Sequence, residues 1–422
     1  MTSSILVVGG GGREHALAWR LAASPSVDRV ESAPGNPGTA ELGPCHAVDV
    51  EDPVAVADLA AERRVDLVVV GPEAPLVAGV VDELDRRGIP AFGPSRAAAH
   101  LEGSKAFAKE VMEGAGVATA GHVATDDRGR AHDALERFTA PYVVKADGLA
   151  AGKGVVICDT LTDARDAVDD ALHRRVFGEA GASVVIEEYL DGPERSVFGV
   201  CDGTEVVLLS PAQDYKRAHD GDRGPNTGGM GAYTPVPGFG LDDVDHLREQ
   251  VFLPVLRELA ARGTPYRGLL YAGLIDTADG LQVLEFNARF GDPETQVILP
   301  RLASDLGMLL TASAAGSVRD VEVSWHDQAV VTVVLASGGY PGAYEKGVAI
   351  EGVEVAAARE GVEVFHAGTT RDDGTLRTAG GRVLNVTARG SSVADARALA
   401  YEAVDDIHFA GRAHRTDIAA GV

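Results

Sequence analysis

The sequence predicts a multidomain protein of mixed α/β and α+β class, with an open parallel α/β domain first and a small β-rich domain last. Its 422 residues correspond to about three domains, and a hydrophobic fraction of 45% is sufficient for several buried cores. Apolar runs ending in glycine turns alternate with helical patterns up to about residue 101, whereas short strands and turns dominate from residue 328. The first pattern is typical of a parallel sheet and the second of a β-rich fold.

The first segment consists of strands that end in turns. ILVVGGGGREHALAWRLAAS reads as a strand, a glycine turn and an amphipathic helix, and VDLVVVGPE (65–73) and IPAFGPS (89–95) repeat the strand and the turn. PGNPGT (34–39) also follows an apolar run. Because the turns at the carboxyl ends of parallel strands meet in one crevice, we expect a ligand there.

The glycine run is not a dinucleotide-binding fingerprint. Its third glycine position holds Glu14 if the count starts at Gly9, and His15 if it starts at Gly10. The hypothesis of a nicotinamide oxidoreductase would rest on this run alone. The general attraction of a helix N-terminus for phosphate remains.

The middle of the chain carries a second glycine-rich turn. After a helical pattern at 101–116, VVKADGLAAGKGVVI (143–157) reads as strand, glycine turn and strand, with Lys145 and Lys153 on either side of the turn. It is not a Walker A loop, because it continues as a strand rather than opening a helix. Such a flap can lay backbone N–H groups over phosphate oxygens, although an ordinary hairpin with solvated lysines has the same pattern.

Lysine is scarce in this chain. Six of the 38 basic residues are lysines, at positions 105, 109, 145, 153, 216 and 346. Lysine is a compact point charge that fits between phosphate oxygens, whereas arginine is a planar fork. The surviving lysines are therefore candidates for a chemical role, with chance placement as the alternative.

A strand-like pattern at GLQVLEFNARFGDPETQ indicates a metal site. A period of two places Glu285 and Asn287 on one face, with Leu284 and Phe286 on the other. Carboxylate and amide oxygens suit Mg²⁺, which usually takes only one or two protein ligands beside substrate phosphates. Arg289 would share this face if the strand continues. The alternative is a polar edge of a sheet.

Two further segments carry candidate binding residues. In VVIEEYLDGPERS, the acids Glu187, Glu188 and Glu194 could accept hydrogen bonds from adenine or ribose, although solvated acids at a strand end are an alternative. AQDYKRAHDGDRGPNTGGMGAY (212–233) is too long and glycine-rich for plain secondary structure, and we interpret it as a substrate loop rather than a disordered surface excursion.

Composition excludes several classes of protein. The formal net charge is −25, from 38 basic and 63 acidic residues, which disfavours binding to nucleic acid or anionic membranes. Three scattered cysteines do not make a disulfide framework or a zinc site. The first residues, MTSSILVVGGGGREH, lack the pattern of a signal peptide or membrane span, so we expect a cytoplasmic protein.

The chain resembles the phosphoribosylamine–glycine ligase family of the ATP-grasp superfamily, through motifs that run in order from about residue 4 to 418. These motifs are GGGGREHALA, VVVGPEAPL, LEGSKAFAK, VVKADGLAAGKGVVI, VIEEYLDG, DYKRAHDGDRGPNTGGMGAY, LEFNARFGDPETQ, and FHAGT with GGRVL. The resemblance implies a phosphoribosyl-substrate domain at 1–101, ATP-grasp central domains at 102–326 with a mobile lid at 122–187, and a C-terminal domain at 327–422.

The resemblance also implies a reaction. ATP would phosphorylate glycine to glycyl phosphate, and the amine of 5-phosphoribosylamine would displace the phosphate, giving glycinamide ribonucleotide, ADP and phosphate. The cofactors would be ATP and Mg²⁺ or Mn²⁺, with no nucleic-acid or membrane partner, and we expect a monomer. Another ATP-grasp carboxylate–amine ligase of nucleotide metabolism and a non-catalytic nucleotide-binding module are the alternatives.

Specific residues take roles by the same resemblance. The nucleotide would be held by Lys105, Lys145, Gly152, Lys153, Gly154, Glu187, Leu190 and Glu194, and the metal by Glu285 and Asn287. The catalytic residues would be Arg289, Lys153 and Asp292. Substrate contacts would come from Gly11, Gly12, Asn36, Glu73, Asp214, Lys216, Arg289 and Asp292.

One position departs from the pattern of many ATP-grasp enzymes. Those enzymes place a further acidic metal ligand about a dozen residues before the Glu-x-Asn pair, where this chain has YAGLID with Ala272 and Gly273. Asp276 is the nearest carboxylate. Two ions held mainly by Glu285, Asn287 and phosphates are the working hypothesis.

Overall fold

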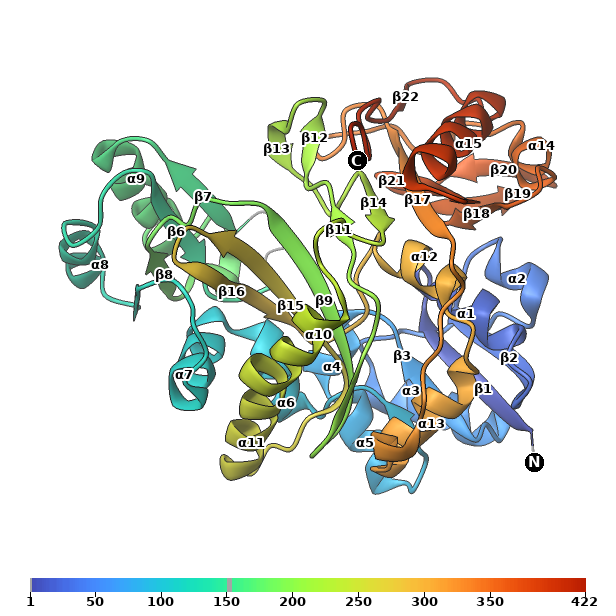
Figure 1. Cartoon of the computed structure of the whole chain (residues 1–422), viewed down its shortest axis with the longest axis horizontal. Helices are drawn as coiled ribbons and strands as arrows, with labels where there is room; N and C mark the ends of the chain where they lie inside the picture. Colours follow the sequence, from blue (N-terminus) through green and yellow to red (C-terminus); the bar gives the residue numbers. More distant parts are fainter. Residues whose placement is uncertain (1, 150–153) are drawn as a thin grey trace.

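The computed structural model describes residues 2–149 and 154–422. The first layer is a parallel sheet in the order β2-β1-β3-β4, as the sequence predicts. Its strands are β1 (Ser3–Gly9), β2 (Val27–Pro34), β3 (Leu67–Val70) and β4 (Ala91–Phe92). Its helices are α1 (Gly12–Ala22), α2 (Thr39–Leu42), α3 (Pro53–Arg63), α4 (Glu73–Ala78), α5 (Val80–Arg86) and α6 (Arg96–Gly103). The turns after β1 and β3 lie at the same edge of this sheet (Figure 1).

A small antiparallel sheet projects from one side of the molecule (Figure 1). Its order is β5-β8-β6-β7, formed by β5 (His122–Thr125), β8 (Val184–Glu187), β6 (Tyr142–Ala146) and β7 (Val155–Cys158). Helices α8 (Arg128–Leu135) and α9 (Leu161–Leu172) pack on it, and together they enclose a hydrophobic core of their own. The predicted strand, turn and strand at 143–157 are confirmed for both flanks, while Gly152 and Lys153 lie outside the described residues.

A larger antiparallel sheet, in the order β10-β9-β15-β16, forms the centre of the molecule. Its strands are β10 (Val206–Leu208), β9 (Glu194–Asp202), β15 (Arg267–Thr277) and β16 (Gly280–Asn287). The helices beside it are α7 (Lys105–Ala115), α10 (Leu241–Leu247), α11 (Leu253–Ala261) and α13 (Leu306–Ala315), whereas α12 (Thr295–Ile298) packs between α1 and the last sheet. A π-helical turn at Arg248–Phe252 joins α10 to α11.

The single helix predicted at 101–116 is interrupted. Ser104 has an extended backbone and ends α6, and its hydroxyl accepts a hydrogen bond from the Phe107 amide at 3.1 Å. Serine at this position satisfies one of the free amides of the first turn of α7, so a new helix begins at Lys105.

The last sheet runs β11-β14-β17-β21-β18, with β22 (Arg412–Ala413) also paired to β17. Its other strands are β11 (Gln213–Asp214), β14 (Gly231–Thr234), β17 (Ala329–Ser337), β21 (Arg382–Gly390) and β18 (Val362–His366). Helices α14 (Val353–Ala357) and α15 (Val393–Asp406) cover it, and β19 (Thr369–Asp372) pairs with β20 (Thr375–Thr378).

The prediction that residues 212–233 lack regular structure is wrong. The segment forms β11, the start of β14, and a hairpin of β12 (Arg217–His219) and β13 (Arg223–Asn226). Its glycine-rich composition hides these strands: β11 pairs with β14, and β14 joins the last sheet through the distant β17. The substrate loop is therefore built onto the last sheet.

Among the described residues, no helix combines the length and apolar character that crossing a membrane requires.

Candidate functional site

Strand β16 places Glu285 and Asn287 on one face, as predicted. Glu285 lies opposite Gly273 and Asn287 opposite Tyr271 on β15. The pairing skips Leu284, so the buried apolar residues are Val283 and Phe286 instead of the predicted Leu284 and Phe286. A bulge of this kind re-aims a side chain without ending the sheet.

The Glu285 carboxylate is surrounded by positive charge. Burial alone would raise the pKa of Glu285, but the nearby Lys216, Lys145, Lys105 and Arg289 lower it, so the group is ionised. Within residues 2–149 and 154–422, no side chain forms a hydrogen bond or ion pair with this carboxylate. An ionised oxygen ligand beside an amide oxygen is a suitable pair for Mg²⁺.

The position on β15 where many ATP-grasp enzymes carry a second acidic ligand holds Ala272 and Gly273 in this chain. Gly273 occupies the position opposite Glu285, and no group of three or more His, Cys, Asp or Glu in the described residues is arranged to hold a metal ion. Asp276 is half-exposed and forms an ion pair with Arg195 at 3.2 Å. The donors present fit a cation that takes its remaining ligands from phosphate oxygens.

Lys145 lies at the end of β6 and belongs to a buried ion cluster. Its Nζ is 2.8 Å from Glu187 Oε2, and Lys109 Nζ is 3.3 Å from the same oxygen. Lys109 also donates to Thr119 Oγ1 at 2.7 Å, and burial lowers its pKa to about 8. Glu187 is 2% exposed, and its Oε1 has no hydrogen-bond partner among the described residues. Glu187 Oε2 thus pairs with two lysines, and the predicted role of Glu187 in binding adenosine stays a prediction.

Sequence reasoning missed Lys109 as a site residue. The available signals were its place among the six lysines and its spacing of four residues from Lys105, which puts both on one face of α7. Lys105 donates to the Gly148 carbonyl at 3.3 Å, and burial lowers its pKa.

Asp147 is a second missed residue, and it fastens the flap to α7. Its Oδ1 accepts from Ser104 Oγ at 3.0 Å and from the Ala106 amide at 2.8 Å. Its Oδ2 accepts from Ser183 Oγ at 2.7 Å. Gly148 and Gly154 flank the undescribed part of the flap, and the Gly154 carbonyl accepts from the Ala146 amide at 2.7 Å.

Asp214 and Lys216 approach the central sheet from the substrate loop. Lys216 forms an ion pair with Glu194, which begins β9. Burial raises the pKa of Asp214 to about 7, and the neighbouring Glu294 and Glu194 add to this effect while Lys216 opposes it. The predicted adenosine residue Glu194 and the predicted substrate residue Lys216 are thus in contact. Leu190 is half-buried in the connection between β8 and β9.

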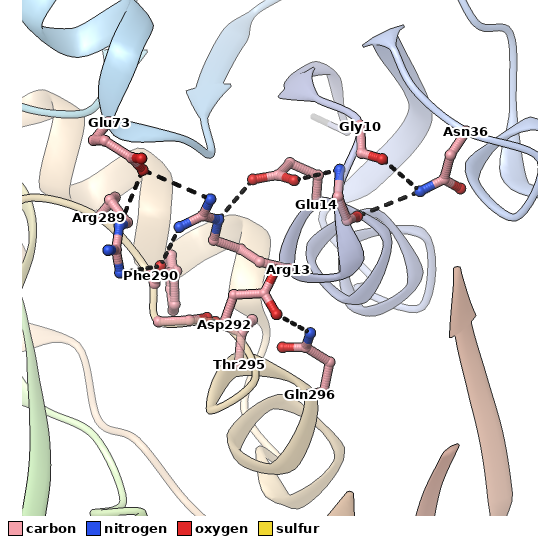
Figure 2. A network of polar contacts seen from close by, with 12 residues as sticks. Gly10, Arg13, Glu14, Asn36, Glu73, Arg289, Phe290, Asp292, Thr295 and Gln296 are labelled. Atoms are coloured by element: carbon pink, nitrogen blue, oxygen red, sulfur yellow. Dashed lines mark hydrogen bonds and ion pairs between the residues drawn. The ribbon is translucent and has the colours of Figure 1, made fainter. Parts of the chain in front are cut away.

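Arg289 lies beyond the end of β16 and connects three elements, and Figure 2 shows its contact with Glu73. Its guanidinium contacts Glu73 Oε2 at 3.3 Å and Glu102 Oε1 at 3.0 Å, and it donates to Asn287 Oδ1 at 3.3 Å. Burial opposes its charge, but Glu102 and Glu73 raise its pKa, so Arg289 is a permanent cation beside the metal-ligand pair. Glu102, from α6, was not predicted.

Arg13 links the glycine run to the same network. Figure 2 shows its guanidinium between Glu14, Glu73 and the Phe290 carbonyl. Glu14 in turn accepts from the Gly11 amide at 2.6 Å. The phosphate-attracting helix terminus predicted here therefore has one of its amides occupied by the protein itself.

Asn36 and Gly12 serve the packing of this region. The Asn36 amide donates to the carbonyls of Gly10, Gly11 and His366, and its oxygen accepts from two backbone amides. A side chain at Gly12 would meet the Asn385 amide nitrogen at 2.4 Å. Only glycine allows this approach between α1 and β21.

Asp292 follows β16 in the chain and lies near residues of α1, α12 and β21. Its Oδ1 accepts from Gln296 at 2.9 Å and lies 3.3 Å from Arg382. Burial alone would raise the pKa of Asp292, but Arg382 and Arg13 lower it. Arg382 was not predicted, although it lies in the motif GGRVL.

Comparisons with known proteins cover almost the entire chain. Sequence profiles for the N domain, the ATP-grasp (A) domain and the C domain of phosphoribosylglycinamide synthetase match residues 3–102, 103–295 and 330–421, respectively. The phosphoribosylamine–glycine ligase of Streptomyces coelicolor is 52% identical over 419 residues, covering 99% of this chain and 98% of the relative. The ligase of Brucella melitensis is 48% identical over 414 residues, covering 98% of this chain and 97% of the relative.

Solved structures have the same architecture. The crystal structure of phosphoribosylamine–glycine ligase from Thermotoga maritima is 35% identical, with a TM-score of 0.85 over 99% of this chain and 100% of that one. The biotin carboxylase domain of a 2-oxoglutarate carboxylase from Hydrogenobacter thermophilus, solved with MgADP and bicarbonate, is 16% identical, with a TM-score of 0.72 over 98% of this chain and 92% of that one. The second likeness concerns the fold alone.

Proposed function

The chain belongs to the phosphoribosylamine–glycine ligase family of ATP-grasp enzymes, which acts in purine biosynthesis, and we propose that it joins glycine to 5-phosphoribosylamine with ATP. The products are glycinamide ribonucleotide, ADP and phosphate. The observation that carries this proposal is the placement of an ionised Glu285, Asn287 and Arg289 opposite Lys105, Lys145 and Lys216.

The first step brings two anions together. A glycine carboxylate oxygen attacks the γ-phosphorus of ATP, the bond to the β-phosphate oxygen breaks, and glycyl phosphate and ADP form. Lys105, Lys145 and Arg289 offset the repulsion between carboxylate and polyphosphate and hold the reactants in line. Lys153 and the turn Gly152–Gly154 are expected to contribute from the flap.

The second step needs no side-chain nucleophile. The amine of 5-phosphoribosylamine attacks the acyl carbon, phosphate leaves, and the amine loses a proton as the amide forms. Asp214 is placed to accept that proton or to hold an ammonium group, because its pKa of about 7 allows both protonation states near neutrality. Because water would also attack glycyl phosphate, we expect the lid at 122–187 to close before transfer.

Glu285 and Asn287 would hold Mg²⁺ or Mn²⁺ together with the phosphates of ATP. A divalent cation supplies charge neutralisation at the transferring phosphoryl group. The chain's own contribution is to keep Glu285 ionised and to aim Asn287 to the same side through the strand period. Because Asp276 forms an ion pair with Arg195, we do not propose it as a metal ligand.

The other predicted residues divide into three groups. Glu73 pairs with Arg289, and Lys216 lies near Glu285, whereas Asp214 lies near Lys216 and Asp292 lies near Arg382 and Arg13. These four residues are proposed to face glycine and phosphoribosylamine. Gly11, Gly12 and Asn36 are proposed to shape the crevice through their backbone contacts. Leu190 and Glu194 remain proposed adenosine contacts, with Glu187 acting through Lys145.

The test is ADP release by the purified protein with ATP and Mg²⁺, with glycine and phosphoribosylamine omitted in turn. We expect ADP formation to require glycine, and formation of glycinamide ribonucleotide to require both substrates. Turnover that ignores both omissions, or that depends on a different acid, would overturn the assignment. The Glu285→Gln variant is the matched inactive control.

A further inference from the structure

The substrate loop is fastened to a short segment late in the chain. Residues 415–419 lie against the β12–β13 hairpin, far from them in sequence (Figure 1). Thr416 donates from its amide to Asp220 Oδ1 at 2.8 Å and from its hydroxyl to Asp220 Oδ2 at 2.5 Å. The Gly221 amide donates to Asp417 Oδ2 at 2.8 Å. Asp220 and Gly221, at the turn of the hairpin, are therefore both held by the segment 415–419.

Arg415 is the centre of this attachment. It is 1% exposed, which is unusual for arginine, and its guanidinium is bonded on every edge. It forms a forked pair with Asp417, with distances of 2.7 and 2.6 Å, and it contacts Asp222 Oδ1 at 2.7 Å and the Arg217 carbonyl at 3.2 Å. Its carbon Cζ lies 4.8 Å from the centre of the Tyr215 ring.

Tyr215 transmits this attachment to the site. The Ala419 amide donates to the Tyr215 hydroxyl at 2.9 Å, and the ring packs against the hydrophobic core of the last sheet. The Tyr215 backbone is bonded in both directions, to the Gly231 carbonyl and the Met230 amide. Because successive side chains of an extended segment point to opposite faces, fixing Tyr215 directs Asp214 and Lys216 toward the central sheet.

The contacts of Asp214 and Lys216 agree with this geometry. Lys216 reaches Glu194 on β9 and approaches Glu285, and Asp214 approaches Glu294 and Lys216. The Lys216–Glu194 contact crosses from the substrate loop to the central sheet, and Asp214 lies near Lys216 and Glu294. A tilt of the loop would therefore displace both charges together. Displacement of a positioned group by about 1 Å can cost a factor of about a hundred in rate.

We infer that Arg415 is a positioning residue for substrate binding: through Tyr215 it sets where Asp214 and Lys216 meet phosphoribosylamine, without touching the nucleotide. This inference rests on the proposed substrate roles of Asp214 and Lys216. The site then contains two groups of residues. Asp214 and Lys216 are positioned by the attachment at Arg415, whereas Lys105, Lys109 and Lys145 are held by α7 and the small sheet.

The experiment uses the full chain with Arg415→Met, and with Asp220→Ala/Asp222→Ala, which loosens the loop from its exposed side. For both variants we expect the KM for phosphoribosylamine, generated in the assay from ribose 5-phosphate and ammonia, to rise by about tenfold or more. The Kd for ATP with Mg²⁺ should remain within about twofold. Hydrogen exchange should increase across residues 213–226 and stay unchanged across 184–187.

Arg359→Met is the matched control, because Arg359 pairs with Asp406 on α15 in the same region and does not contact the loop. Arg415→Lys, which keeps the charge but loses the fork, should give an intermediate KM. Faster exchange at 213–226 with an unchanged KM would overturn the inference, as would unchanged exchange. If Arg415→Met does not fold, the variant Asp220→Ala/Asp222→Ala tests the inference. A wild-type protein that ignores phosphoribosylamine would instead overturn the proposed function.

Discussion

Glu285 is the residue whose charge state matters most for the proposed reaction. Its carboxylate stays ionised while buried because four cationic side chains surround it. A carboxylate in such a setting is available to a metal ion, whereas a structural acid on a polar sheet face would be paired with one of its neighbours. Its role can therefore be tested separately from its contribution to stability.

We expect Glu285→Gln to lower kcat by about a hundredfold or more, roughly 2.7 kcal/mol of transition-state stabilisation, with little effect on folding. The amide keeps the shape but removes the charged ligand. Steady-state kinetics over a range of Mg²⁺ concentrations measure the effect, and partial rescue at high Mg²⁺ would support ligation directly. Asp276→Asn is the control, because this carboxylate pairs with Arg195. Equal losses of kcat in the two variants would indicate that Asp276 is also a metal ligand.

Lys109 provides a second test at the residue scale. Lys109→Met leaves Lys145 as the single cation within contact distance of Glu187 among the described residues, so the carboxylate should hold Lys145 more tightly and compete with phosphate for it. We expect the KM for ATP to rise by about tenfold, and the KM for glycine to stay unchanged.

Lys346→Met is the control for this prediction, because Lys346 is an exposed lysine in the last segment of the chain. If both lysine variants behave like the wild type, the scarcity of lysine reflects coding bias alone.

Among the elements, helix α7 and strand β6 depend on one carboxylate. Asp147 accepts three hydrogen bonds that join the end of β6, the cap of α7 and the residue before β8. Lys105 and Lys145 each lie within two residues of one of these anchor points, Ala106 and Asp147. The distance between the two phosphate-directed lysines is thus set by this junction.

We expect Asp147→Ala to destabilise the fold by about 2–4 kcal/mol, because three donors lose a charged acceptor. Weaker ATP binding should accompany the loss, since Lys105 and Lys145 would no longer be fixed relative to each other. Thermal unfolding with and without ATP measures both effects. Asp163→Ala is a suitable comparison, because the Asp163 carboxylate also accepts a hydrogen bond near a helix start, from the Thr160 hydroxyl, but lies on α9. The prediction fails if the two variants lose ATP affinity equally.

At the scale of the whole molecule, two buried histidines join the first and last sheets. His15 Nδ1 accepts a hydrogen bond from the His366 amide at 2.8 Å, and its ring packs on Phe365 with centroids 5.5 Å apart. Burial, with a contribution from His366, lowers the pKa of His15 to about 3. Burial, with a contribution from Arg371, lowers the pKa of His366 to about 4. Both rings are neutral in the folded protein.

This junction predicts sensitivity to acid. Histidine in the unfolded chain has a pKa of about 6.5, so the stability from these groups is complete above that pH and is lost as pH falls toward 4 and then 3. Each histidine should reduce the free energy of unfolding by about 1.4 kcal/mol per pH unit in this window. Thermal midpoints between pH 7 and 4 should fall less steeply for His15→Gln, which keeps an acceptor, than for the wild type. Parallel profiles would contradict this prediction.

The sequence by itself determined the local features of this protein. The two strands on either side of the turn after Lys145, the common face of Glu285 and Asn287, and the parallel first sheet follow from periodicity and turn residues. These features depend on neighbours a few positions away, which the sequence displays directly. Val283, and not Leu284, is the buried neighbour of Phe286 on β16. Periodicity alone does not predict this change, because the bulge that causes it depends on pairing with β15.

Only the tertiary structure decided which charges meet. Arg289 contacts Glu73, 216 positions away, and Arg415 contacts Asp222, 193 positions away. Lys216 pairs with Glu194, and Lys109 shares Glu187 with Lys145. No periodicity encodes these partners, because they depend on how separately folded sheets pack against one another. The residue types of the site are local information, whereas its charge balance is a property of the assembled molecule.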